Sequence, residues 1–232
     1  MRWLSFVFGF IFCLHVTVWA QQAELDSLQQ LLVKQADDTS KVKTLNELSY
    51  VYYQTAVYDS ELYYAQQALT LAQKLNWKRG MAVSLKNIGS ACDDMGNNSD
   101  ALVYYGRALN IFSSIDAKSG VSACYNNMGL VYRTIGNFSE ALKNHYASLK
   151  IKETLGDKNG IALSYNNIGV VLYAQKNYSE AIKSHLAALE IRKALGNKRG
   201  IASSYGNMGN VYQAQGNYKE ALKNYEQTLK IE

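Results

Sequence analysis

Apolar and polar positions along this 232-residue chain follow the period of an amphipathic helix. In one representative stretch the apolar positions are spaced four, three, four and three residues apart: Val121, Tyr125, Met128, Tyr132 and Ile135. Side chains with this spacing lie on one face of a helix. A matching stripe follows 40 residues later at Ile161, Tyr165, Ile168 and Leu172. The pattern therefore predicts one such helix in each 40-residue repeat, here called helix A.

A second apolar face follows helix A after a short break, such as Gly136-Asn137-Phe138. Its expected buried residues are Ala141, Leu142, His145, Ser148, Leu149 and Leu155. This face predicts a second helix, helix B, that packs on helix A. Helix B is expected to end at Gly156, and Gly160 is expected to precede the next helix A.

Two ladders of glycine share the spacing of 40 residues. The first is Gly80, Gly120, Gly160 and Gly200, and the second is Gly89, Gly129, Gly169 and Gly209. Gly129 on helix A faces the small residues Ala141 and Ser148 of helix B, so we expect the two backbones to approach closely there. A repeat of this length is typical of a solenoid, in which each unit buries its apolar face on its neighbours. The sequence therefore predicts an all-α fold whose function resides on an extended surface.

The repeat phase divides the chain into three segments. Residues 1–20 combine Arg2 with an apolar run and small residues before Gln21, which predicts a cleaved secretory signal peptide, with an uncleaved membrane anchor as the alternative. Residues 21–36 are predicted to form a capping helix. Residues 37–232 are predicted to form an array of about five units, of which the last is truncated.

Asparagine stands three residues before an acidic residue at the start of each predicted helix B that follows a complete helix A. The pairs are Asn97 and Asp100, Asn137 and Glu140, Asn177 and Glu180, and Asn217 and Glu220. This is the spacing of a capping box, in which each side chain bonds to the other residue's backbone N–H. The first three asparagines also begin a glycosylation acceptor sequence. Asn217 keeps the capping spacing although Lys219 removes the acceptor, so capping is the preferred interpretation.

The composition is that of a folded protein, with 48% apolar residues, 19% charged residues and no proline. The net charge of +5 is spread along the chain, so nucleic acid is not an expected partner. Cys13 belongs to the predicted signal peptide. Cys92 and Cys124 occupy different repeat positions, and we expect two buried thiols and no disulfide.

Several of these residues resemble the signature of the tetratricopeptide repeat family: Tyr125, Met128-Gly129, Tyr132, Gly136-Asn137-Phe138, Glu140-Ala141 and Ser148. The resemblance covers residues 37–232 and implies a right-handed α-solenoid of stacked antiparallel helix pairs. Two features depart from the family pattern. The period is 40 residues where about 34 is usual, and the terminal proline is replaced by Gln73, Ser113, Glu153 and Lys193. This longer form is similar to repeats in peptide-binding polarity adaptors and in exported sensor regions of bacterial signalling proteins.

The sequence contains no motif for catalysis or cofactor binding, so neither an enzyme activity nor a cofactor is expected. His145 and His185 occupy the same helix B position in adjacent repeats, a spacing that suggests metal ligands. Tyr105 and Tyr225 fill that position in other units. The position therefore requires a large, half-buried ring, and no metal site is expected.

The family resemblance implies that helix A lines a concave groove. The peptide-binding residues expected there are Lys86, Asn87, Asn126, Asn127, Arg133, Asn166, Asn167, Tyr173, Asn207, Asn210 and Gln213. Asparagine both donates and accepts hydrogen bonds, so it suits the backbone of an extended peptide. The alternative is a structural role, in which Asn127 and its equivalents bridge neighbouring helices. Positions that vary between repeats, such as Arg133, are expected to set selectivity.

Two functions fit these observations. The first is a non-catalytic scaffold that binds a protein or an extended peptide segment in the helix A groove. The alternative is the exported sensory region of a membrane signalling receptor, such as a histidine kinase, of which this chain is an N-terminal fragment. Either function implies export to the periplasm or the medium. A membrane is expected to take part only through an uncleaved anchor or a further C-terminal span.

Overall fold

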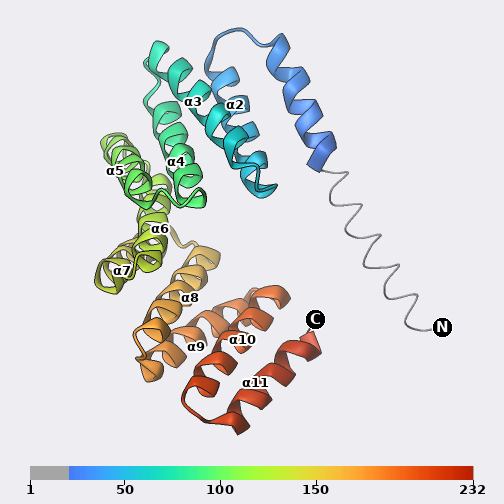
Figure 1. The fold of residues 1–232 in the computed structure, drawn as a ribbon, viewed down its shortest axis with the longest axis vertical. Helices are drawn as coiled ribbons and strands as arrows, with labels where there is room; N and C mark the ends of the chain where they lie inside the picture. The colour runs from blue at the N-terminus through green and yellow to red at the C-terminus, as the bar shows by residue number, and fades with distance from the viewer. Residues whose placement is uncertain (1–20, 232) are drawn as a thin grey trace, which may run out of the picture. The chain divides into compact units, whose positions relative to one another are not determined.

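The computed structural model describes residues 21–231, and within that range it contains helices and no strands. One helix covers residues 21–34. The others are α2 (Thr39–Gln54), α3 (Tyr58–Lys74), α4 (Lys78–Asp94), α5 (Asn98–Ser114), α6 (Lys118–Thr134), α7 (Phe138–Leu155), α8 (Lys158–Ala174), α9 (Tyr178–Ala194), α10 (Lys198–Ala214) and α11 (Tyr218–Ile231) (Figure 1). Even numbers are A helices and odd numbers are B helices, and the all-α class is confirmed.

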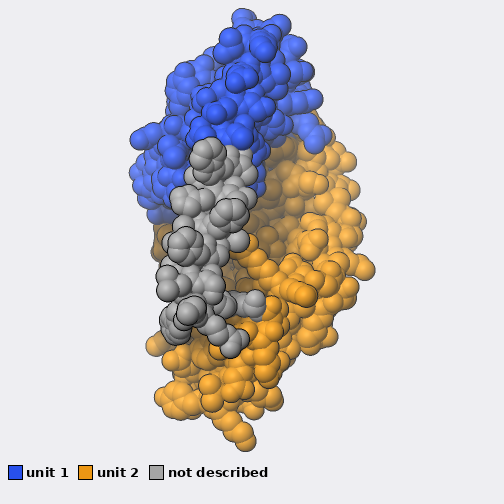
Figure 2. Space-filling view, turned by 90° about the vertical axis from the view of Figure 1, so that its right-hand side faces the viewer, with its two compact units in different colours: residues 1–111 blue, residues 112–232 orange. Residues whose placement is uncertain are grey.

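The described residues form two compact units, unit 1 and unit 2, which divide between residues 111 and 112 (Figure 2). In unit 1, α3 packs between α2 and α4, and these two A helices also contact each other. In unit 2, each helix from α6 to α11 packs on the next, and α8 contacts both α6 and α10. Each unit is therefore a stack of helix pairs in which A helices neighbour A helices.

The turns between helices share one backbone conformation. A residue with positive φ follows the helices at every twentieth position: Ala56, Asn76, Gly96, Asp116, Gly136, Gly156, Lys176, Gly196 and Gly216. After α6, for example, the Asn137 N–H donates to the Tyr132 carbonyl at 2.8 Å, which closes the helix end. The backbone thus repeats every 20 residues although the sequence repeats every 40.

The buried face of helix A differs from the predicted stripe. In α6 the buried residues are Ser122, Cys124, Gly129 and Val131, whereas Tyr125 and Met128 are half-buried. Small side chains occupy the closest helix contacts because α6 packs against both α7 and α8. The prediction that Ile135 and Leu155 are buried is wrong, since they are 49% and 43% exposed. Ile135 is the C-cap of α6 and Leu155 the last residue of α7, so both lie at helix ends.

The second glycine ladder makes room for a ring of helix B. A β-carbon on Gly129 would lie 2.7 Å from Cε1 of His145, and one on Gly169 would lie 2.6 Å from Cε1 of His185. Gly89 and Gly209 face tyrosine rings in the same way. The group beside Gly129 is therefore the His145 ring, and not the small residues Ala141 and Ser148 as predicted.

The first glycine ladder lies inside the A helices. Gly160 is the third residue of α8, so the prediction that it precedes the helix is wrong. A β-carbon there would meet Asp157 and would lie 2.8 Å from Cδ of Lys152. Gly160 therefore leaves space for a helix B side chain and for the residue that caps α8.

Side-chain capping is confirmed at two of the predicted boxes. The Glu140 N–H donates to Oδ1 of Asn137 at 3.2 Å, and Asn217 caps α11 in the same way at 3.3 Å. Asn177 makes no such bond, contrary to the prediction. The reciprocal half of the box is also wrong at Asn137, because that residue's N–H already donates to Tyr132.

The helix of residues 21–34 packs on α2 within unit 1. Leu25, which is 7% exposed, contacts Leu48 and Val51, and Nε2 of Gln29 donates to the Tyr52 hydroxyl at 3.1 Å. The predicted signal peptide, residues 1–20, lies outside the described residues. Among the residues described, no helix is long and apolar enough to cross a membrane. Cys92 and Cys124 are buried and form no disulfide, as predicted.

Candidate functional site

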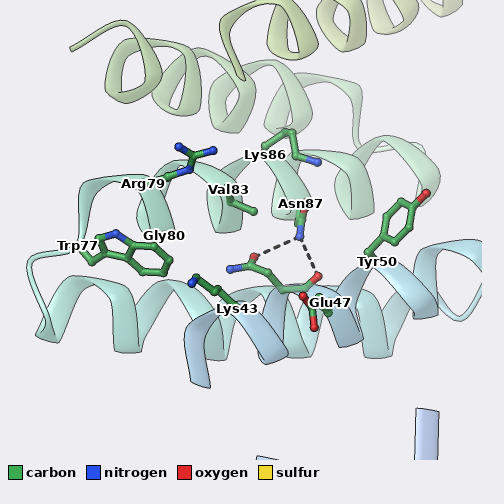
Figure 3. A pocket seen from close by; sticks show the side chains of 10 residues that line it. Lys43, Glu47, Tyr50, Trp77, Arg79, Gly80, Val83, Lys86 and Asn87 are labelled. Atoms are coloured by element: carbon green, nitrogen blue, oxygen red, sulfur yellow. Dashed lines mark hydrogen bonds between the residues drawn. The ribbon is translucent and has the colours of Figure 1, made fainter. Parts of the chain in front are cut away.

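A pocket of about 640 Å³ opens between the A helices α2 and α4 of unit 1 (Figure 3). Its lining consists of Lys43, Asn46, Glu47, Tyr50, Trp77, Arg79, Gly80, Val83, Lys86 and Asn87. Trp77 is the residue before α4, and all the others lie on the two A helices. In Figure 3, Trp77 and Tyr50 lie at opposite ends of the pocket, with the cationic side chains between them.

Two buried amides form the floor of this pocket. Asn46 and Asn87 are only 7% and 6% exposed. Nδ2 of Asn87 donates to Oδ1 of Asn46 at 3.2 Å, and Nδ2 of Asn46 donates to Oγ of Ser84 at 3.1 Å. Because these bonds fix both side chains, a ligand meets a surface that is already ordered.

The rim of the pocket is predominantly cationic. Lys43, Arg79 and Lys86 contribute three positive charges and Glu47 one negative charge, so the formal charge of the lining is 3 − 1 = +2. Lys43, Arg79 and Glu47 are exposed, and Lys86 is half-buried. A pocket of this sign attracts anionic groups and raises their rate of association.

A buried carboxyl group on α3 interacts electrostatically with Lys86 of the pocket. Glu61 is 1% exposed, and its Oε2 has no hydrogen-bond partner in the structure. Burial, followed by the charge of Asp94, raises the pKa of Glu61 to about 7, although a hydrogen bond with Ser90 and the charge of Lys86 act in the opposite direction. Lys86 thus has two roles, because it lines the pocket and its charge also attracts the ionised form of Glu61.

Unit 2 carries a ladder of amide hydrogen bonds along its A helices. Nδ2 of Asn167 donates to Oδ1 of Asn126, and Nδ2 of Asn207 donates to Oδ1 of Asn166, each at 3.0 Å. The Asn46 and Asn87 pair in unit 1 has the same separation of 41 residues. Donor and acceptor therefore come from neighbouring repeats, so these asparagines do bridge adjacent A helices.

The remaining predicted residues of unit 2 are not joined to this ladder by hydrogen bonds, except for Asn127, whose Oδ1 lies 3.4 Å from Nδ2 of Asn126. Arg133 is half-buried with an unpartnered Nε. Tyr173 is 38% exposed, and its ring centroid lies 6.0 Å from that of Tyr178. The Tyr225 hydroxyl lies 2.8 Å from Oδ1 of Asn210 and from Oε1 of Gln213. The assignment of these residues to a binding groove stays a prediction.

Asn167→Ala is expected to lower the free energy of unfolding by about 1 kcal/mol, because Oδ1 of Asn126 loses its donor from the next repeat. Asn127→Ala removes only a long bond within one helix and is expected to cost less. Urea denaturation of the two variants measures the difference. Equal losses would mean that the ladder does not stabilise the stack.

Two buried cations on helix B were missed by the analysis of the sequence. Nη1 of Arg192 donates to Oγ of Ser204 at 2.7 Å and to Oδ1 of Asn166 at 3.3 Å, and Nζ of Lys152 donates to Oγ of Ser164 at 3.1 Å. Burial lowers the pKa of both cations. The separation of 40 residues between Lys152 and Arg192 was the feature of the sequence that could have identified them. Arg192 also donates to Oδ1 of Asn166, the oxygen that accepts from Asn207, and so helps to fix that side chain.

The pocket was predicted only in part, through Lys86 and Asn87. Asn46 and Glu47 stand 40 residues before them, so extending the ladder by one repeat would have found both. Trp77 lies outside the helices and carries no periodic signal. Its ring packs over Gly80, which is a contact that only the fold reveals.

The two histidines are more buried than predicted. His145 and His185 are 0% and 1% exposed, so the expectation of a half-buried ring is wrong. Each ring fills the space over a glycine of its own repeat. Burial, with the charges of Arg133 and Lys152 at His145 and of Arg192 at His185, lowers the pKa of each imidazole to about 4. Across residues 21–231, no group of three or more His, Cys, Asp or Glu side chains is arranged to hold a metal ion.

Stacked helix pairs, in which neighbouring A helices are joined by an amide ladder, define an α-helical repeat protein. The sequence model of the tetratricopeptide repeat matches residues 80–154 and 160–231, which is more than half of the chain. The chain belongs to the tetratricopeptide repeat family.

Solved structures support this fold. BtubC from P. vanneervenii is similar over 92% of this chain and 89% of its own, with 20% identity and a TM-score of 0.75. A STAND protein with a tetratricopeptide repeat sensor from Pyrococcus horikoshii has 17% identity over 94% of this chain and 34% of its own, with a TM-score of 0.77. A Rap protein in complex with competence and sporulation factor has 14% identity over 93% of this chain and 72% of its own, with a TM-score of 0.73. No curated protein matches the sequence significantly.

Proposed function

We propose that the chain is a non-catalytic scaffold that binds a protein or an extended peptide segment on its A helices. The observation that carries this proposal is the pocket of about 640 Å³ between α2 and α4, with its ordered amide floor. Tetratricopeptide repeats are generally scaffolds for protein binding, and the similar Rap protein was solved in complex with competence and sporulation factor.

The chemistry of the A helices fits an extended backbone. Asn167 and Asn207 use one amide hydrogen each in the ladder, which leaves the second hydrogen and the carbonyl oxygen for a ligand. Each bond to a peptide contributes only about 1 kcal/mol net, so binding requires several of them together. A partner is therefore expected to lie along more than one repeat.

Export of the chain to the periplasm or the medium is part of the proposal and rests on residues 1–20. The alternative function, the sensory region of a membrane receptor such as a histidine kinase, uses the same binding surface. No observation in the described residues favours it over the scaffold.

Site-specific photo-crosslinking tests which face binds. Val83 lies in the pocket on helix A, and Val103 is 58% exposed on helix B, so two full-length variants with a photoreactive residue at one of these positions form a matched pair. We expect partner adducts from position 83 and none from position 103 when the variants are exposed to the exported protein fraction. Adducts from position 103 alone would show that the outer face binds, and the proposal would be wrong.

A further inference from the structure

We infer that the pocket of unit 1 selects an acidic peptide segment, which places carboxylates among Lys43, Arg79 and Lys86. This inference rests on the proposed scaffold function and names the partner of the same site. Three cationic side chains line a single opening, whereas the one carboxylate in the lining is Glu47.

Two of the cations are available to a ligand. Lys43 and Arg79 are exposed, and within residues 21–231 no carboxylate lies within ion-pair distance of either. A carboxylate from a partner would therefore form new charge-assisted hydrogen bonds without breaking existing ion pairs. Lys86 adds its charge from α4, the helix that also carries Arg79, and lies across the opening from Lys43 of α2 in Figure 3.

The two lysines belong to this pocket and are not a general feature of the repeat, whereas Arg79 recurs in phase as Arg199. Positions in phase with Lys43 hold Val83, Ala123, Leu163 and Ser203. Positions in phase with Lys86 hold Asn126, Asn166 and Gly206. Neutral residues satisfy the fold at both places, so packing does not require the two lysines. Their presence points to a ligand that carries the opposite charge.

Glu47 favours a peptide over a continuous polyanion. It stands in phase with Asn87, Asn127, Asn167 and Asn207, and so puts a negative charge where the other repeats hold an amide. A nucleic acid strand presents regularly spaced phosphates that cannot avoid this charge, whereas a peptide can present a neutral residue there. The rings of Trp77 and Tyr50 at the two ends of the pocket offer apolar surface to such neutral side chains.

The test is binding of the full-length chain to three fluorescent octapeptides that differ only in alternate residues, which are Glu, Gln or Lys. We expect the Glu peptide to bind at least about tenfold more tightly than the Gln peptide at low salt, with the difference reduced at high salt. Lys43→Ala combined with Arg79→Ala is expected to remove that preference. Lys78→Ala, a neighbouring exposed cation outside the pocket, is the matched control and is expected to leave it unchanged.

Glu47→Asn provides a gain in the opposite direction, because it restores the residue found at this position in the other repeats. It is expected to tighten binding of the Glu peptide several-fold, and far-UV circular dichroism verifies that each variant is folded. Equal affinity for the Glu and Gln peptides would overturn the inference and leave the scaffold function intact. Tighter binding of a single-stranded oligonucleotide than of the Glu peptide would also overturn it. Failure of all three peptides, together with no adduct from position 83, would instead count against the scaffold function itself.

Discussion

Gly169→Val is expected to destabilise unit 2 by about 1 to 3 kcal/mol or more through overpacking. A β-carbon at this position would lie 2.6 Å from Cε1 of His185 and 2.8 Å from both ring nitrogens. The imidazole is 1% exposed and has no free volume into which to move. Valine adds two further methyl groups at the same contact, so α8 and α9 must separate.

An alanine pair isolates the steric cause from helix propensity. Gly169→Ala is expected to destabilise the fold, whereas Gly206→Ala in the interior of α10 is expected to stabilise it by about 0.5 to 1 kcal/mol, because the nearest atom to its β-carbon is 3.8 Å away. His185→Ala combined with Gly169→Ala is expected to cost less than the sum of the single changes. Chemical denaturation followed by circular dichroism measures all four. Similar effects of the two glycine substitutions would refute the ring contact as the cause.

Glu61→Gln is expected to make the fold more stable than the wild type at pH 8 and to bring little change at pH 5. The pKa of Glu61 is raised from 4.5 to about 7, so the folded state favours the protonated carboxyl group. The wild type therefore gains stability below the unfolded pKa and loses it as the pH rises through about 7. The full shift corresponds to at most about 3 kcal/mol, from 1.36 kcal/mol per pKa unit. Glutamine keeps the shape of the side chain and cannot ionise.

The comparison must be between variants at each pH, because other groups titrate in the same window. The pKa of His145 and of His185 is lowered to about 4, so these residues contribute stability that is lost as the pH falls from 6.5 towards 4, opposite in sign to Glu61. Glu47→Gln changes an exposed carboxyl group of the same unit and is the matched control. A difference between Glu61→Gln and wild type that stays constant from pH 5 to pH 8 would contradict the prediction.

The period of the sequence was sufficient to predict the helix pairs, because the apolar spacing at Tyr125 and Met128 recurs in each repeat and the glycine at position 129 recurs in all but the first, which has Ser49. It was not sufficient to predict which helix face is buried. A helix in a stack contacts several neighbours, so Cys124 and Ser122 are buried while larger apolar residues are only half covered. Periodicity identifies an apolar face and carries no information on how closely each neighbour approaches.

The candidate site was predictable to the extent that it repeats. Asn167 and Asn207 followed from the ladder, although their bonds to neighbouring repeats required the structure. Arg79 and Trp77 did not follow, because one is a charged residue in a first helical turn and the other lies in a connection. The residues that make one site differ from the next are those that do not follow the repeat, and a search for repeated positions does not find them.

The turn that recurs at every twentieth position limits how such an array grows. Gain or loss of 40 residues inside either unit keeps the contacts between helix A glycines and helix B rings, and it keeps the amide hydrogen bonds between neighbouring A helices. Gain or loss of 20 residues preserves the backbone turn equally well but exchanges A and B sequences, so that the contact of Gly129 with His145 and the amide pairs between neighbouring A helices are lost. Duplication of complete helix pairs is therefore the step in evolution or engineering that lengthens this array without repacking its interior.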